Sequence, residues 1–79
     1  MSNREKYDTI FMESLSLQRE GLTGGLVYNS VKAWDSVGHM AMMAALENGF
    51  DIMLDTEDII AFSSYHKGME ILAKYGVEF

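Results

Sequence analysis

The sequence predicts an all-α fold: a small four-helix bundle of three long helices and one short helix, with a long loop between helices 1 and 2. Three observations support this. Apolar residues recur at helical spacing in separate segments. Glycine or asparagine marks where several of these segments end. The 79 residues include no proline to break a helix and no cysteine to form a disulfide. A chain of this length is one domain, residues 1–79.

The first helix is expected over residues 3–17, and Ser2 or Asn3 can cap its start. Residues on and beside one face recur every three or four positions, which is helical spacing. These residues are Tyr7, Ile10, Phe11, Ser14, Leu15 and Leu17.

A long connection follows over residues 18–35, and three glycines interrupt it. A structureless loop of this length is unusual in a small domain. Apolar residues punctuate it, so we expect it to pack across the bundle. They are Leu22, Leu26, Tyr28, Val31 and Trp34. A short strand over residues 26–28 is an alternative that we do not favour, and Trp34 is expected to have a packing role.

The second helix is expected to begin at Ser36 and to end near Asn48 and Gly49. A broad apolar stripe runs along it: Val37, Met40, Met43, Ala44, Leu46 and Phe50. A short helix is predicted around residues 56–62, with Thr56 as its cap. The last helix should start after Ser63 or Ser64 and end at Gly76.

The core of so short a chain is thin, because a small domain buries a smaller fraction of its surface than a large one. We expect seven residues to form it: Phe11, Leu15, Leu46, Phe50, Ile59, Phe62 and Leu72. Little room remains for a deep, enclosed active site. The length therefore favours a module on which other proteins act and disfavours an enzyme.

The net charge of −6 comes entirely from the second half of the chain. Residues 1–34 hold equal numbers of acidic and basic side chains, whereas residues 35–79 are strongly acidic. Acidic surfaces repel nucleic acid and attract basic patches on other proteins. No stretch approaches the ~20 apolar residues of a membrane helix, and no signal peptide is evident. We therefore expect a cytoplasmic protein that binds neither nucleic acid nor membranes.

Ser36 stands at the expected start of the second helix, directly after Asp35. Its simplest interpretation is an N-cap, since serine is common there. A helix start also suits a phosphate group, because free backbone N–H groups and the positive end of the helix dipole lie there. The serine hydroxyl is thus a candidate for carrying a phosphodiester.

Asp35-Ser36-Val37 resembles the Asp-Ser-Leu signature of acyl and peptidyl carrier proteins. The similarity covers most of the chain. It includes Leu46-Glu47, residues 50–52, Asp55, residues 57–59, residues 62–64, Met69 and residues 71–72. It implies that a phosphopantetheinyl transferase moves 4′-phosphopantetheine from coenzyme A onto Ser36. The thiol of the arm then holds an acyl or aminoacyl group as a thioester.

Under this resemblance the chain is a monomeric carrier and not an enzyme. Its partners are the phosphopantetheinyl transferase, an acyl- or aminoacyl-loading enzyme, and downstream transferases or synthases. Carriers of fatty acid synthesis usually have Leu-Gly-Ala before Asp-Ser, whereas this chain has Lys32-Ala33-Trp34. Their following helix usually has several acids, whereas here Glu47 is the only one. Trp34-Asp35-Ser36 followed by His39 resembles carriers of specialised pathways, such as polysaccharide decoration or natural-product assembly.

Five residues are expected to bind partner proteins. Val37, Met40 and Ala44 share one helix face, because they are spaced by three and four residues. Asp35 and Glu47 stand at opposite ends of the same helix and can offer charge to basic surfaces.

The alternative function is a non-enzymatic helical interaction module. Its groove, rich in methionine, would bind an amphipathic partner helix. Met40, Met42 and Met43 are adjacent enough to contribute, although three such positions cannot share one face. We expect a mixture, with one or two of them filling the core.

Two other sites are disfavoured. Ser36 and His39 have the spacing of a nucleophilic pair, but no glycine-flanked elbow or oxyanion site accompanies them. We expect His39 on the surface near the arm, and His66 to be exposed. The acids from Asp51 to Glu57 resemble a calcium loop, yet the positions that need glycine and glutamate hold Thr56 and Phe62. No metal site is predicted.

Overall fold

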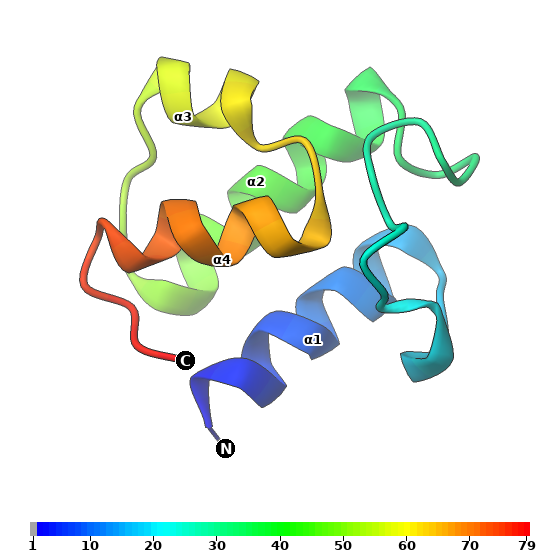
Figure 1. Cartoon of the computed structure of the whole chain (residues 1–79). Helices are drawn as coiled ribbons and strands as arrows, with labels where there is room; N and C mark the ends of the chain where they lie inside the picture. Colours follow the sequence, from blue (N-terminus) through cyan, green and yellow to red (C-terminus); the bar gives the residue numbers. More distant parts are fainter. Residues whose placement is uncertain (1) are drawn as a thin grey trace.

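The structure is a computed structural model that describes residues 2–79 and contains four α-helices and one 3-10 helix in that range. The helices are α1 (Asn3–Leu15), η1 (Arg19–Gly21), α2 (Ser36–Phe50), α3 (Thr56–Ala61) and α4 (Tyr65–Ala73). Figure 1 shows α4 in front of α2, with α3 above them and α1 below. The prediction of an all-helical chain with a long connection before Ser36 is confirmed.

The ends of α1 and α2 follow local backbone chemistry. Ser2 caps α1 in a capping box with Glu5, as one of the two expected caps. The helix stops at Leu15, two residues before the predicted end, because Ser16 adopts the left-handed conformation. Helix α2 begins at Ser36 as predicted and continues past Gly49 to Phe50, where left-handed Asp51 ends it.

The caps of the two later helices differ from each other. Asp55 is the N-cap of α3, so the prediction of Thr56 as the cap is wrong, because Thr56 already lies within the first helical turn. Ser64 caps α4 by accepting a hydrogen bond from the backbone N–H of Lys67. After α4 the chain turns at Gly76, which has a φ of 87°.

A single cluster of buried side chains joins α1, α2, α4 and the connecting segments, and Ile59 of α3 packs against it. The cluster contains Tyr7, Phe11, Leu15, Leu26, Trp34, Met42, Met43, Leu46, Leu54, Phe62, Tyr65, Ile71, Leu72 and Val77. Trp34 packs edge-on against Phe11 with ring centroids 5.6 Å apart, which confirms its packing role. Five of the seven expected core residues are present. Phe50 and Ile59 are only partly buried at the edge of this core, so their expected central position is wrong.

The residues between η1 and α2 pack back onto the helices, as expected. The backbone N–H of Tyr65 donates to the carbonyl of Leu26 at 2.9 Å, and that of Tyr28 donates to the carbonyl of Ser63 at 2.8 Å. Val27 and Ser64 form an isolated antiparallel bridge in place of the disfavoured strand. This pairing fixes the loop against the start of α4.

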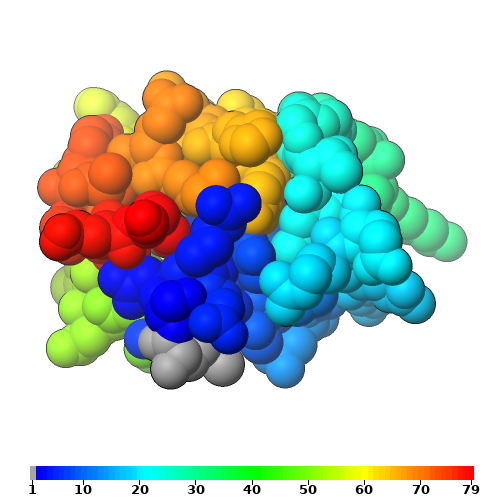
Figure 2. Space-filling model, turned by 60° about the horizontal axis from the view of Figure 1, so that its bottom comes forward, coloured from blue at the N-terminus to red at the C-terminus, as the bar shows by residue number. Residues whose placement is uncertain are grey.

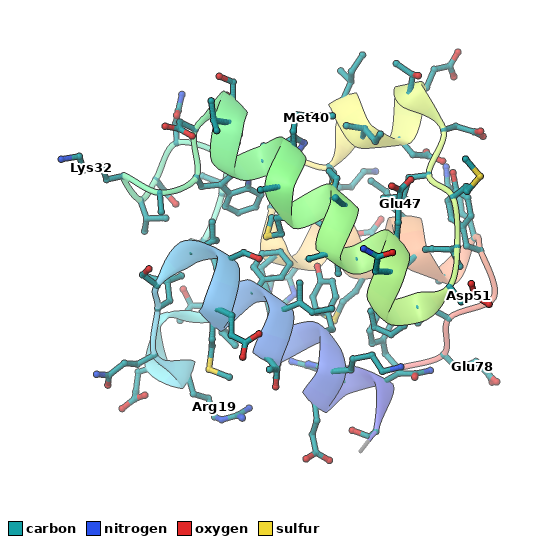
Figure 3. The ribbon with its side chains drawn as sticks, turned by 180° about the vertical axis from the view of Figure 1, so that it is seen from behind. Arg19, Lys32, Met40, Glu47, Asp51 and Glu78 are labelled. Atoms are coloured by element: carbon teal, nitrogen blue, oxygen red, sulfur yellow. The ribbon has the colours of Figure 1, made fainter. Side chains whose placement is uncertain are left out.

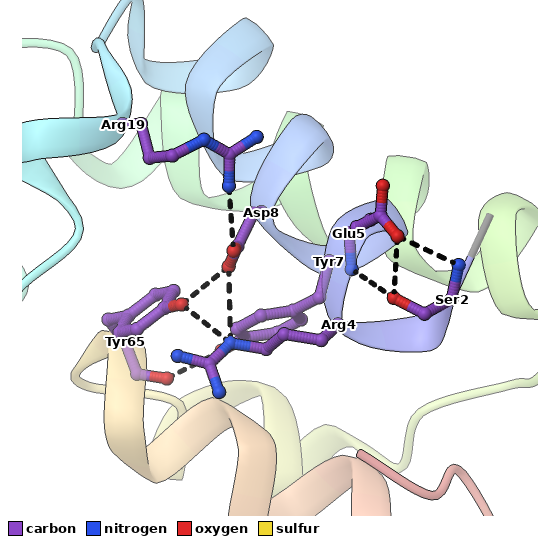
Figure 4. Close-up of polar contacts among 7 residues, drawn as sticks. All are labelled: Ser2, Arg4, Glu5, Tyr7, Asp8, Arg19 and Tyr65. Carbon is purple, nitrogen blue, oxygen red and sulfur yellow. Dashed lines mark hydrogen bonds and ion pairs between the residues drawn. The ribbon is translucent and has the colours of Figure 1, made fainter.

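A buried carboxylate links α1, η1 and α4. Asp8 accepts hydrogen bonds from the Tyr65 hydroxyl and from Arg19, and its carboxylate lies 3.6 Å from Arg4 (Figure 4). The pKa of the Tyr65 hydroxyl is raised, first by burial and then by its bond to Asp8. Paired in this way, a buried charge is tolerated within the core.

The two ends of the described chain lie close together. The side-chain amide of Asn3 donates to the carbonyl of Glu78 at 2.9 Å, and Figure 2 shows the C-terminal segment beside the start of α1.

Within residues 2–79, every helix falls short of the length and apolar character needed to cross a bilayer.

Candidate functional site

Ser36 is the first residue of α2, and its side chain is exposed to solvent. The cap itself is Asp35, whose Oδ1 accepts a 2.8 Å hydrogen bond from the backbone N–H of Gly38. The simplest interpretation of Ser36 as an N-cap is therefore wrong, because the neighbouring carboxylate performs that role. The serine hydroxyl stands at the start of a 15-residue helix without being used for capping.

Gly38 allows the segment just before α2 to lie close to the first turn of that helix. A β-carbon at position 38 would lie 1.9 Å from the carbonyl oxygen of Ala33 and 3.4 Å from Oδ1 of Asp35. Glycine therefore lets residues 33–35 press against the first turn of α2, and this contact fixes the position of Ser36.

A groove with a volume of about 300 Å³ opens beside Ser36. Its lining residues come from the loop, α2, α3 and the segment after α3: Tyr28, Ser36, His39, Met40, Ile59, Ile60, Phe62 and Ser63. Asp, Glu, Lys and Arg are absent from this lining set, which lies wholly within the described chain. Figure 3 shows Met40 on the side of α2 that faces α3. The groove therefore suits an uncharged, largely apolar occupant.

His39 is buried at the inner side of this groove, so its expected position on the surface is wrong. Nδ1 accepts a 2.9 Å hydrogen bond from the indole N–H of Trp34, and Nε2 lies 2.8 Å from the carbonyl oxygen of Ile59. Both ring nitrogens are thus engaged away from Ser36, which argues against a serine–histidine nucleophilic pair. His66, by contrast, is exposed as predicted.

Of the five expected partner-binding residues, four are exposed and one is half-buried. Val37 is 78% exposed, Met40 is 54% exposed and Ala44 is also exposed, so these three side chains are accessible along α2. Asp35 is exposed beside Ser36. Glu47 is half-buried near the other end of α2 and its Oε2 accepts a hydrogen bond from the backbone N–H of Leu54 at 2.8 Å. Glu47 therefore orders the chain after α2 and lies apart from the groove lining.

One further feature of the groove is not evident from sequence alone. Ile60 of α3 is 76% exposed and, together with Met40 of α2, gives the groove an apolar mouth. The only signal in the sequence is a pair of isoleucines in a short helix, of which one must face outward. Met42 and Met43 are buried in the core, which confirms the expected mixture and leaves Met40 as the methionine at the groove.

Comparison with known proteins finds no match to any family model and none among curated proteins. Within residues 2–79, His, Cys, Asp and Glu do not gather in groups of three or more that could hold a metal ion.

Proposed function

We propose that this chain is an acyl carrier protein with a four-helix-bundle fold, modified by 4′-phosphopantetheine on Ser36. One observation carries the proposal: an exposed serine hydroxyl at the first residue of α2 stands at the mouth of an uncharged, mostly apolar groove. The similarity of Asp35-Ser36-Val37 to the carrier signature supports the same conclusion.

The residues present fit such an arm at both of its ends. A phosphodiester on Ser36 lies at the N-terminus of α2, where the helix dipole favours negative charge. The groove offers apolar walls from Met40, Ile59 and Ile60, and hydroxyl groups from Ser63 and Tyr28 at its polar positions. When attached, the arm supplies a thiol that holds an acyl group as a thioester.

Ser36 is the one residue of this chain that takes part in bond making. Its Oγ attacks the pyrophosphate of coenzyme A, and the Oγ–P bond forms as the P–O bond to 3′,5′-ADP breaks. The hydroxyl proton leaves to a base on the transferase. Asp35 holds the helix start through Gly38 and so positions the Ser36 hydroxyl.

The surface around Ser36 suits basic partner enzymes that also offer apolar contact. Val37 and Ile60 are strongly exposed on α2 and α3, and the net charge of the chain is −6. We propose that the carrier acts as a cytoplasmic monomer. Its partners are a phosphopantetheinyl transferase, an acyl- or aminoacyl-loading enzyme and downstream transferases or synthases. The helix after Ser36, with Glu47 as its single acid, supports a role in a specialised pathway.

Co-expression with a broad-specificity phosphopantetheinyl transferase, followed by intact-mass measurement, tests the proposal. We expect the wild-type chain to gain the mass of one arm and Ser36→Ala to gain none. Ser16→Ala is the matched control, because Ser16 is an exposed serine outside the groove lining. It should be modified fully. An unmodified wild-type chain would contradict the proposal and favour the helical interaction module. Full modification of Ser36→Ala would show that the site is wrong.

A further inference from the structure

We infer that His39 is a positioning residue that fastens α3 to α2, sets the width of the groove beside Ser36 and so shelters a thioester held there. The fastening is a property of the chain itself. Only its last consequence, the shelter of a thioester, depends on the proposed carrier function.

The hydrogen bonds of His39 define one tautomer. The indole nitrogen of Trp34 is only a donor, so the Nδ1 atom that it faces at 2.9 Å must be the unprotonated acceptor. In the neutral ring the proton then resides on Nε2, which donates to the carbonyl oxygen of Ile59 at 2.8 Å. One side chain of α2 therefore bridges the loop and α3.

The surroundings of the imidazole make these bonds hard to replace with water. The ring lies nearly coplanar with that of Trp34, with planes 14° apart, as their hydrogen bond requires, and Tyr28 and Phe62 meet it edge-on. His39 is 9% exposed. A buried polar group that loses its partner is costly, so removal of the imidazole leaves the Trp34 N–H and the Ile59 carbonyl unsatisfied.

Helix α3 depends on such external contacts for its position. It is six residues long, and helices this short are not stable by themselves in water. On the side of α4, Asp58 is bound by Lys74 and Tyr75. On the side of α2, the bond from His39 satisfies a carbonyl in the last turn, where no intrahelical partner exists.

The wall of the groove follows from this attachment. Ile59 and Ile60 of α3 form one side of the groove, and Ser36 and Met40 of α2 form the other. If the His39 bond is lost, the last turn of α3 has no hydrogen bond to α2, so Ile59 and Ile60 can move away from Met40 more readily. Water then reaches a group that the intact groove encloses.

The tautomer provides the first test, on the unmodified chain. At neutral pH, ¹⁵N shifts of the His39 ring should show a bare Nδ1 and a protonated Nε2. His66 is the internal reference, because it is exposed and is the only other histidine. A protonated Nδ1 in the neutral ring would overturn the inference, since it could not accept the bond from Trp34.

Amide hydrogen exchange tests the attachment of α3 in the same chain. We expect His39→Phe, which keeps a ring but has no polar atom, to speed exchange at residues 59–63 about tenfold, the equivalent of about 1.4 kcal/mol. His39→Gln retains an acceptor and an N–H donor, so it should recover part of the protection. His66→Phe is the matched control and should leave exchange unchanged. Should His39→Phe fail to fold, Trp34→Phe removes the donor to Nδ1 while retaining an aromatic ring. Unchanged exchange in the folded His39 and Trp34 variants would overturn the attachment.

Thioester cleavage tests the functional consequence. The wild-type chain and the three histidine variants are loaded with an octanoyl-bearing arm, and cleavage by neutral hydroxylamine is followed by intact mass. We expect cleavage about tenfold faster in His39→Phe than in the wild type or His66→Phe. If neither the wild type nor any variant can be loaded, the result counts against the carrier function. The tautomer and hydrogen-exchange tests then still decide whether His39 attaches α3 to α2. Equal cleavage rates on fully loaded chains would show that His39 does not shelter the thioester.

Discussion

A β-carbon on Gly38 would lie 1.9 Å from the carbonyl oxygen of Ala33, so the turn before α2 and the first turn of that helix fit together only with glycine. Gly38→Ala should force the backbone apart at the start of α2. We expect it to lower the free energy of unfolding by about 1–3 kcal/mol. It should also slow modification of Ser36, which lies two residues away. Urea denaturation and the rate of arm transfer measure the two effects.

Gly25→Ala is the control for this prediction. Its β-carbon would meet only the Thr23 hydroxyl, at the ordinary contact distance of 3.8 Å. Its stability should stay within about 0.5 kcal/mol of the wild type. If Gly38→Ala is equally neutral, residues 33–35 are free to move away from the helix and do not fix Ser36.

The cap of α2 gives a second prediction. Asp35 accepts the capping hydrogen bond from Gly38, so Asp35→Ala should cost about 1 kcal/mol of stability. Ser36→Ala should change stability by less than about 0.5 kcal/mol, because the Ser36 hydroxyl is not the cap. Chemical denaturation of both variants ranks the two residues. The reverse order would mean that Ser36 provides the cap.

The core prediction compares two phenylalanines. Phe11 is fully buried and packs against Tyr7, Trp34 and Tyr65, so Phe11→Ala should cost about 3–5 kcal/mol. Phe50 is only half-buried at the end of α2. Phe50→Ala should therefore cost about half as much. Thermal or urea unfolding distinguishes them, and equal losses would place Phe50 in the centre of the core.

Most of the helices were predictable because helical periodicity and capping residues are local features of the sequence. Helical periodicity identified α1 and α2, and Ser64 was one of two serines expected before α4. The errors are also local. Ser16 and Asp51 adopt positive φ although neither is glycine. The ends of α1 and α2 therefore could not be predicted from a glycine in the sequence.

The candidate site was only partly predictable, because its geometry depends on residues distant in sequence. Ser36 and Val37 lie where the motif suggested, but the wall formed by Ile59 and Ile60 depends on how α3 packs. Burial of His39 could not be read from its polarity. It is buried because Trp34 and Ile59 offer one donor and one acceptor at the right positions.

Acid should weaken the attachment between α3 and α4. Hydrogen bonds from Lys74, at 2.6 Å, and from Tyr75 hold the pKa of Asp58 below its ordinary value of about 3.9. Because the folded pKa lies below the unfolded one, this stabilisation is present above about pH 4 and is lost as the pH falls through the folded pKa. We expect Asp58→Asn to lower the melting temperature at pH 7 and to have a smaller effect at pH 2.

Thermal unfolding by circular dichroism from pH 7 to pH 2 measures this difference. A pH-independent difference between Asp58→Asn and the wild type would show that the carboxylate charge contributes nothing.

The last prediction concerns the surface that partner enzymes contact, and it depends on the proposed carrier function. Val37 is 78% exposed directly after Ser36 and should enter the centre of the complex with a phosphopantetheinyl transferase. Val37→Asp would place an unpaired charge in that apolar contact. We expect it to speed dissociation at least about tenfold, which corresponds to about 1.4 kcal/mol. Binding is measured in the Ser36→Ala background, which prevents turnover during the experiment.

Met53→Asp is the matched control, because Met53 is 84% exposed but lies beyond the end of α2 that is opposite Ser36. It adds the same charge and should leave the dissociation rate unchanged. Salt screens the acidic charge of the chain and so acts mainly on association. A contact centred on Val37 should therefore weaken only modestly between low and physiological salt. If affinity collapses with salt while Val37→Asp is harmless, recognition is electrostatic, and the apolar face of α2 is not what the transferase contacts.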